Sequence, residues 1–369
     1  MAEINFFFSH RYDLIKELAQ RGWEFNIIGY SGDLIPKSEK NINYIFINSN
    51  RERFGILNLI INVRKLSKEI SLHDPNLIYA ISHRSILLSC LSSLLTKKKS
   101  IYAITGMGSV FTPNKFFFKK FFLKILKLIL FYTYRLLIKQ KYSSFILQNS
   151  DDLDLLVANK IAQRNNSHII PGNGLPKKYF SSTVSSNKNF KFVMVSRILR
   201  DKGVIEYLLA ANNVSKDFPE CEFELYGSFD HNNPQSITLD DIKHYLSPKI
   251  IYKGFEKNIR DKLIESNVLV LPSYREGFAR VLMEAQACSR PVITSNIPGC
   301  KDVIIENKTG LLTEPMDVSG IEKNMKYFLK NPQQYLIMSK NSFKHAMDNF
   351  SINQAADYHE EIFNKILSD

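Results

Sequence analysis

The sequence predicts an α/β protein with two domains, each a parallel sheet wound on both faces by helices. Short apolar runs rich in β-branched residues alternate with longer runs of helical periodicity. This alternation occurs twice, on either side of a polar, turn-rich stretch. The chain has 369 residues, about twice the size of a usual single core, which also favours two domains.

The first series of elements extends to residue 148. Its strands are predicted at Ile4–Phe8, Glu24–Tyr30, Tyr44–Asn48, Leu77–Ser82, Ser100–Thr105 and Ser143–Gln148. Its helices are predicted at Tyr12–Arg21, Leu57–Leu72 and Ser85–Leu95. Strands that alternate with helices at this spacing pair in parallel through right-handed crossovers. The run before Ser9 is short, so we expect either a minimal first strand or a trimmed start.

The second series has the same pattern. Its strands are predicted at Lys191–Ser196, Glu222–Tyr226, Ile250–Lys253, Val268–Pro272, Pro291–Thr294 and Gly310–Thr313. Helices are predicted between them, for example at Val204–Asn213 and Ala279–Cys288, and a last helix at Asn353–Leu367. Turn residues at 171–174 and 181–187 indicate an interdomain linker. We therefore expect domains at 1–174 and 175–352, with a terminal helix over 353–369 that packs back toward the first domain.

Composition excludes several classes of protein. Apolar residues make up 44% of the chain, which excludes a disordered or fibrous protein. The cysteines form no Cys-x-x-Cys pair, so a disulfide framework or zinc knuckle is not expected; they are Cys90, Cys221, Cys288 and Cys300. Polar residues interrupt the apolar run at the start, so no signal peptide is expected there. These features favour a reducing compartment.

The positive charge is concentrated in one segment. The formal net charge is +13, and the segment 97–142 contributes +11 of it because it holds eleven Lys and Arg and no Asp or Glu. The same segment is rich in phenylalanine, leucine and isoleucine. A basic surface of this kind favours a polyanionic partner: nucleic acid, an acidic membrane or a phosphorylated substrate.

Spacing within this segment favours a membrane surface. Lys120, Lys124 and Lys127 share one face of a helix, whereas Phe121 and Phe122 lie elsewhere on it. A membrane-spanning helix would place these lysines in hydrocarbon, so an amphipathic helix lying on an anionic leaflet fits better. The alternatives are a core helix with a solvated lysine face, and nucleic-acid binding, for which no recognition motif is found.

The densest polar cluster of the second half follows a buried strand. Glu276 lies in the predicted strand-to-helix loop, and Glu284 lies inside the following helix. Backbone N–H groups of this loop and the helix N-terminus would form an anion site suited to a diphosphate. The alternative is one exposed loop glutamate and one solvated helical glutamate.

A second cluster follows the first strand of the second half. Arg197 and Lys202 would pair with phosphate oxygens, the arginine through its fork and the lysine as a point charge. Taken alone, this cluster is better explained as ordinary surface charge before a helix, with Asp201 as the helix cap.

Together these clusters resemble the retaining glycosyltransferases of family 4, over nearly the whole chain. The motifs in the second half are Arg197, Lys202-Gly203, the E-x7-E pair Glu276/Glu284, residues 288–294, Pro298-Gly299 and residues 309–312. In the first half, residues 8–11, 104–111, 148–149 and 171–174 resemble the bacterial O-antigen and capsule subgroup. The resemblance implies a GT-B architecture, in which two Rossmann-like domains face a central cleft.

The resemblance also implies roles for individual residues. Arg197 and Lys202 would bind the donor diphosphate and neutralise the leaving UDP. Glu276 would hold the donor sugar hydroxyls, Glu284 would hold the ribose hydroxyls, and residues 277–279 would contribute to donor binding. The family needs no metal or cofactor, because cationic side chains and a helix dipole stabilise the developing charge.

One first-half loop departs from the family pattern. Many relatives carry a histidine in this loop, where the present sequence has residues 105–108. Backbone groups of Gly106 and Gly108 would substitute for it, with His10 or His83 as polar contributors.

The activity implied is transfer of a sugar, an N-acetylhexosamine in this subgroup, from a UDP-sugar to an undecaprenyl-diphosphate-linked saccharide. This reaction belongs to O-antigen, lipopolysaccharide or capsule synthesis. We expect a cytoplasmic enzyme, peripheral at the inner face of the cell membrane, whose first domain faces the acceptor and whose second binds the donor. Nucleic acid is not expected as a partner. The alternatives are a sugar-nucleotide epimerase of the same fold and a non-enzymatic basic membrane- or nucleic-acid-binding protein.

Overall fold

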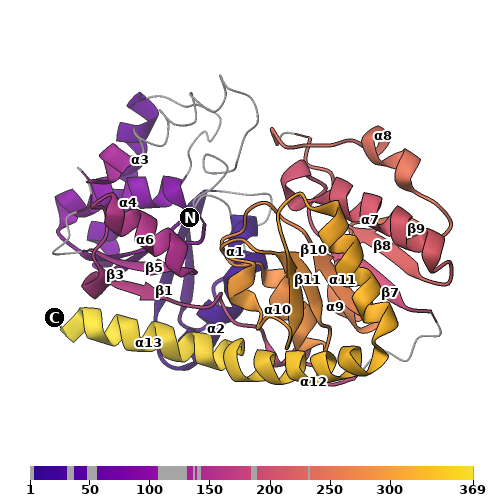
Figure 1. Cartoon of the computed structure of the whole chain (residues 1–369). Helices are drawn as coiled ribbons and strands as arrows, with labels where there is room; N and C mark the ends of the chain where they lie inside the picture. The colour runs from indigo at the N-terminus through magenta and orange to yellow at the C-terminus, as the bar shows by residue number, and fades with distance from the viewer. Residues whose placement is uncertain are drawn as a thin grey trace. The chain divides into compact units, whose positions relative to one another are not determined.

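The computed structural model describes residues 4–30, 37–47, 56–106, 131–135, 138, 143–183, 189–231 and 233–368. The chain divides into two compact units: unit 1 comprises residues 1–174 and 352–369, and unit 2 comprises residues 175–351. Each unit is an α/β structure with parallel strands (Figure 1). The predicted fold class is therefore confirmed.

Unit 2 is built on a six-stranded sheet in which every pairing is parallel. Its strands are β7 (Lys191–Val195), β8 (Glu222–Tyr226), β9 (Ile250–Gly254), β10 (Val268–Leu271), β11 (Val292–Ser295) and β12 (Gly310–Thr313). Its helices are α7 (Val204–Asp217), α8 (Leu239–Ile242), α9 (Ile259–Ile264), α10 (Arg280–Ala287), α11 (Val318–Lys330) and α12 (Pro332–Asn349). Strands β10 and β11 are buried along their whole length, as expected of parallel strands covered on both faces.

The strand order of this sheet, β12-β11-β10-β7-β8-β9, contains a reversal. From β7 the chain moves outward to β8 and β9, and it then returns to the other side of β7 to form β10, β11 and β12. Ligands of doubly wound sheets bind outside the carboxyl ends of the strands at such a switch point. In unit 2 this position is the end of β7 and the end of β10.

Unit 1 contains two sheets among its described residues, and all their pairings are parallel. One pairs β1 (Phe25–Tyr30) with β2 (Ile42–Ile47), and the other has the order β3 (Leu77–Ile81), β4 (Lys99–Ile104), β5 (Ser143–Leu147), β6 (Ser167–Ile169). The helices are α1 (Ile4–His10), α2 (Tyr12–Gln20), α3 (Ile56–His73), α4 (His83–Thr96), α6 (Ser150–Ala158) and α13 (Ile352–Ser368).

The terminal helix α13 packs within unit 1, against α2 and the start of β1. Arg21, which follows α2, bonds Asp357 at 2.6 Å and Glu360 at 2.7 Å. Trp23 Nε1 donates to Glu360 at 2.9 Å, and the Trp23 ring lies edge-on to Phe363 with centroids 5.1 Å apart. Although α13 is distant from unit 1 in sequence, these contacts make it part of the unit 1 core.

The prediction of a first strand over Ile4–Phe8 is wrong, because these residues belong to helix α1. Phe7 is fully buried in a cluster with Ile15 and Ile27. The N–H of Arg11 donates to the Phe7 carbonyl at 2.8 Å, so the helical bonding continues toward α2. Burial of one aromatic side chain on the helix face therefore outweighs the local strand pattern.

Candidate functional site

Two loops meet at the switch point of unit 2. One follows β7 and spans residues 196–203, and the other follows β10 and spans residues 272–279. The N–H of Tyr274 donates to the Asp201 carbonyl at 2.8 Å, which joins the loops through their backbones. Gly203 has φ +75°, and a Cβ there would lie 2.2 Å from the Pro272 carbonyl oxygen. Only glycine permits this approach.

This approach brings together two of the site residues predicted from the sequence. Lys202 Nζ donates to Glu276 Oε1 at 2.7 Å, and the hydroxyl of Ser273 donates to the same oxygen at 2.9 Å. The side chains of Lys202 and Glu276 are only 14% and 17% exposed. Burial acts to lower the pKa of Lys202, but the negative charge of Glu276, the hydrogen bond to Glu276 and the negative charge of Asp201 together outweigh burial, and the pKa is raised. Lys202 is therefore a fixed cation at the switch point.

A third loop, after β11, supports the loop that carries Glu276. Gly299 has φ +77°, and a Cβ there would lie 2.6 Å from the Glu276 carbonyl oxygen and 2.5 Å from that of Gly277. The N–H of Ala279 donates to the Gly299 carbonyl at 2.8 Å. The Ala279 N–H is thus already bonded, so its role is to hold the loop. Phe278 is half-buried and packs edge-on to Phe350.

Glu284 lies inside α10 and is 7% exposed, which excludes the alternative of a solvated helical glutamate. Arg280, the first residue of α10, donates its Nε–H to Glu284 at 2.8 Å. Burial raises the pKa of Glu284, and the Arg280 charge acts against this rise. The i, i+4 spacing of these residues on a helix is the feature of the sequence that favours their pairing.

Arg197 lies at the same end of the sheet but has a different environment. Its side chain is 56% exposed, and Nη1 bonds Asp230 Oδ2 at 3.0 Å. Asp201 is not the cap of α7, as one alternative held, because Gly203 occupies the capping position in a left-handed conformation. Instead, one carboxylate oxygen of Asp201 is buried without a hydrogen-bond partner, and burial raises the pKa of this group.

The supporting residues Ser273, Tyr274 and Gly299 were not predicted as site residues. Pro298-Gly299 was recognised only as a motif, although a Pro-Gly turn after a buried strand indicates a backbone that needs positive φ. Nothing in the sequence predicts the hydrogen bond from Ser273 to Glu276 except that the two residues are close together along the chain.

In unit 1, the structure brings together two of the predicted contributors. His83 Nε2 lies 3.2 Å from the Gly106 carbonyl oxygen, and His83 Nδ1 lies 2.8 Å from the Tyr134 hydroxyl. His10 is exposed, its Nδ1 lies 2.6 Å from the Ser9 hydroxyl, and its carbonyl accepts from Asn173 at 3.0 Å. The remaining predicted residues lie outside the described residues: Gly108, Lys120, Phe121, Phe122, Lys124 and Lys127.

Residues 177–345, which lie within unit 2, match the family described as glycosyl transferases group 1. The match identifies unit 2 as a group 1 glycosyltransferase domain. The chain is a retaining glycosyltransferase of family 4, as the motifs implied. Among the described residues, no helix of this glycosyltransferase is long and apolar enough to cross a membrane.

The whole chain is similar to known proteins. It is 24% identical over 375 residues to the N,N'-diacetylbacillosaminyl-diphospho-undecaprenol alpha-1,3-N-acetylgalactosaminyltransferase of Campylobacter jejuni, covering 97% of this chain and 95% of that protein. A glycosyltransferase structure from Rickettsia africae matches with TM-score 0.76 at 19% identity, covering 97% and 94%. Anabaena HepE in complex with UDP matches with TM-score 0.75 at 14% identity, covering 96% and 94%. The structures establish the GT-B fold.

Proposed function

We propose that this glycosyltransferase transfers an N-acetylhexosamine from a UDP-sugar to an undecaprenyl-diphosphate-linked saccharide, with retention, in surface polysaccharide synthesis. The observation that carries the proposal is the Lys202–Glu276 pair, held at 2.7 Å at the switch point of unit 2. A cation and a carboxylate there match the two parts of a nucleotide sugar, its diphosphate and its hydroxyls. The likeness to a protein named for an undecaprenol-linked acceptor supports the choice of acceptor.

Charge assigns the two side chains to different parts of the donor. The phosphates of a UDP-sugar are anionic, so they would approach the ammonium of Lys202 and be repelled by the carboxylate of Glu276. Sugar hydroxyls donate hydrogen bonds, so Glu276 would accept from them. Without donor, Lys202 is neutralised by Glu276, and donor binding would replace one bond of Lys202 with a bond to phosphate.

The chemical step would use the same cations. As the bond between the anomeric carbon and the phosphate oxygen breaks, negative charge grows on the departing UDP. Lys202 and the exposed guanidinium of Arg197 would stabilise this charge, which is electrostatic catalysis by groups already in position. The acceptor hydroxyl would attack from the face that UDP leaves, and a phosphate oxygen would take its proton. Glu284, buried beside Arg280, would accept from the ribose hydroxyls.

A transfer assay tests this function. The purified protein is incubated with each of a panel of UDP- and GDP-sugars and a short lipid-diphosphate saccharide, and product is extracted into organic solvent. We expect transfer from a UDP-N-acetylhexosamine, and a loss of about 100-fold or more in Glu276→Gln. Glu306→Gln is the control, because Glu306 is exposed in unit 2. Full turnover by Glu276→Gln would contradict the proposed role, and an epimerised nucleotide sugar formed without acceptor would indicate the epimerase alternative.

The proposal places the enzyme on the cytoplasmic membrane surface, with unit 1 on the acceptor side. Its support is the +11 charge of residues 97–142, which would attract anionic lipid headgroups. Changing Lys120, Lys124 and Lys127 to serine should release the protein from anionic vesicles in a salt-sensitive manner. The matched control changes three exposed lysines of unit 2, Lys308, Lys340 and Lys344. Equal vesicle binding by both variants would favour the core-helix alternative.

A further inference from the structure

A tyrosine fastens the loop that carries Glu276 to helix α7. Tyr274 lies two residues before Glu276, and its hydroxyl donates to Glu206 Oε1 at 2.5 Å. Its backbone N–H donates to the Asp201 carbonyl at 2.8 Å, so side chain and backbone both hold this end of the loop. The N–H of Ala279 is bonded to the loop after β11. Glu276 therefore lies between two anchored points.

The bond between Tyr274 and Glu206 satisfies a carboxylate that has few other partners. Glu206 lies in the first turn of α7, where the helix dipole favours a negative charge. Its second oxygen, Oε2, is buried and has no hydrogen-bond partner among the described residues. Burial, the hydrogen bond to Glu206 and the charge of Glu206 raise the pKa of Tyr274. The hydroxyl therefore stays protonated and donates.

The anchor matters most when the donor is bound. In the structure, Glu276 Oε1 accepts from Lys202 at 2.7 Å and from Ser273 at 2.9 Å. If Lys202 turns to the diphosphate of the donor, the carboxylate loses the first of these bonds. Ser273 and Glu276 are on the two sides of Tyr274 along the chain, so a movement of the loop at Tyr274 would displace both. The position of the carboxylate then depends on the anchor.

We propose that Tyr274 is a positioning residue for transfer: by binding Glu206, it keeps the Glu276 carboxylate in place on the donor sugar once Lys202 has turned to the diphosphate. This inference rests on the proposed function, which gives Glu276 its contact with the sugar. Tyr274 acts through Glu276 and contacts neither sugar nor UDP. Loss of its hydroxyl should therefore lower kcat and leave UDP affinity unchanged.

The competing role for Tyr274 is support of the fold alone. Tyr274→Phe leaves the Glu206 carboxylate buried without its donor, and this destabilises unit 2 whatever happens at the site. Replacement of both partners by apolar side chains removes most of that cost, because no polar group is left unpaired. The double variant Tyr274→Phe/Glu206→Met therefore separates the two roles. It should regain stability, but its loop still lacks the anchor.

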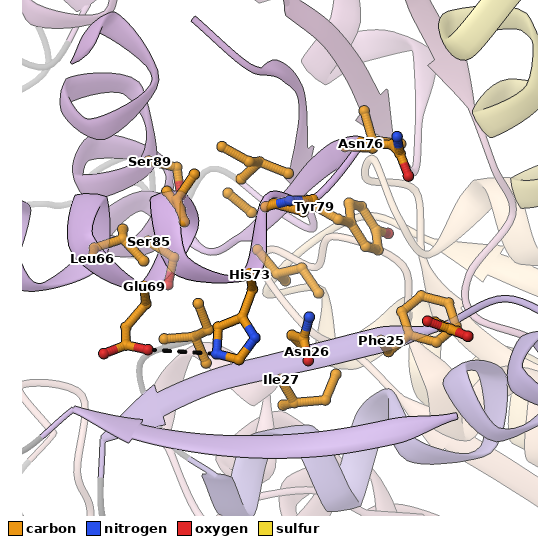
Figure 2. A pocket seen from close by; sticks show the side chains of 18 of the residues that line it. Phe25, Asn26, Ile27, Leu66, Glu69, His73, Asn76, Tyr79, Ser85 and Ser89 are labelled. Atoms are coloured by element: carbon orange, nitrogen blue, oxygen red, sulfur yellow. Dashed lines mark ion pairs between the residues drawn. The ribbon is translucent and has the colours of Figure 1, made fainter. Parts of the chain in front are cut away.

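Unit 1 offers a matched control. Tyr79 of β3 lines a cavity of about 520 Å³ between β1 and β3, two strands that belong to separate sheets (Figure 2). Its hydroxyl accepts from Arg11 Nη1 at 3.3 Å and lies 3.1 Å from His359 Nε2. Tyr79→Phe is thus the same chemical change, the loss of a hydrogen-bonded hydroxyl, in the other unit. It should lower stability and leave kcat unchanged.

The experiment combines three measurements on each full-length variant: kcat and KM for the UDP-sugar, UDP affinity by isothermal titration, and the midpoint of urea unfolding. We expect Tyr274→Phe and Glu206→Met each to lower kcat about 10-fold or more, because small displacements of a reacting group are costly. The double variant should lower kcat no further than either single variant. Glu206→Gln, whose amide oxygen still accepts from Tyr274, should retain kcat.

Three results would overturn the inference. They are an unchanged kcat in Tyr274→Phe, a kcat that recovers together with stability in the double variant, and an equal fall of kcat in Tyr79→Phe. If Tyr274→Phe does not fold, the comparison of Glu206→Met with Glu206→Gln tests the same bond, and equal kcat values would contradict it. Full turnover by Glu276→Gln would instead contradict the proposed function itself, so the two failures are distinguishable.

Discussion

Changing Lys202 to methionine removes the cation at the switch point while it keeps the aliphatic stem that packs there. A charge-assisted hydrogen bond to a phosphate is worth about 1.5–3 kcal/mol, so UDP affinity should fall by about 10- to 150-fold. The loss should lie at the upper end of this range. Glu276, whose side chain is 17% exposed, would keep its negative charge without the ammonium that lies 2.7 Å away, and it would repel the diphosphate.

The partner variant should behave in the opposite way. Glu276→Gln removes this repulsion and releases Lys202 from its ion pair, so UDP should bind at least as tightly as it does to the unmodified protein. In the double variant, the missing carboxylate should restore part of the affinity that Lys202→Met loses. The two changes are therefore expected to be non-additive, as contacting residues in one ion pair usually are.

Isothermal titration of UDP into the four proteins measures this cycle. Thermal unfolding accompanies each titration, because removal of one partner of a poorly exposed pair also destabilises the fold. Lys308→Met, at an exposed position of unit 2, is the control. The reasoning is refuted if Glu276→Gln weakens UDP binding as much as Lys202→Met does, or if the two effects simply add.

Three further predictions concern other side chains. Arg197→Ala should weaken UDP binding about 10-fold or more, whereas Arg200→Ala, which changes an exposed neighbour, should not. Equal UDP titration curves for the two variants would contradict a contact between Arg197 and phosphate. Glu284→Ala removes the acceptor and should abolish the preference for UDP over its 2′,3′-dideoxy analogue, and a preserved preference would remove the ribose role. Burial lowers the pKa of His359 to about 4, so the folded protein keeps it neutral where the unfolded chain is protonated. The free energy of unfolding should thus fall by up to about 3 kcal/mol between pH 6.5 and pH 4, and it should fall less in His359→Gln. Urea unfolding followed by Trp23 fluorescence at each pH measures this fall. Identical pH profiles for the unmodified protein and His359→Gln would exclude His359 as its cause.

The sequence predicts unit 2 better than unit 1, for physical reasons. Buried parallel strands such as β10 are continuous apolar runs, which periodicity detects directly. Lys202 and Glu276 each follow such a strand, so strand order alone brings them to one edge of the sheet. The pairing of Glu284 with Arg280 and the close approach of Gly299 depend on side-chain packing and backbone angles that no periodicity reports.

Unit 1 shows where local pattern fails. Residues 4–8 have the composition of a strand, yet they form α1 because Phe7 is buried against side chains of α2 and β1. The interruption between β1 and β3 is also invisible in the sequence, because both strands have ordinary strand patterns. Only the sheet order and the cavity beside them reveal it.

The central claim is that the loops after β7 and β10 form the donor site. The most direct measurement is hydrogen exchange of the unmodified protein with and without saturating UDP. The account predicts slower exchange of the amides in residues 196–203 and 273–280, with a clearly smaller change when UDP is added to Lys202→Met at the same concentration. The account would be contradicted if UDP left amide exchange in these two loops unaltered, or if UDP protected only other parts of the chain.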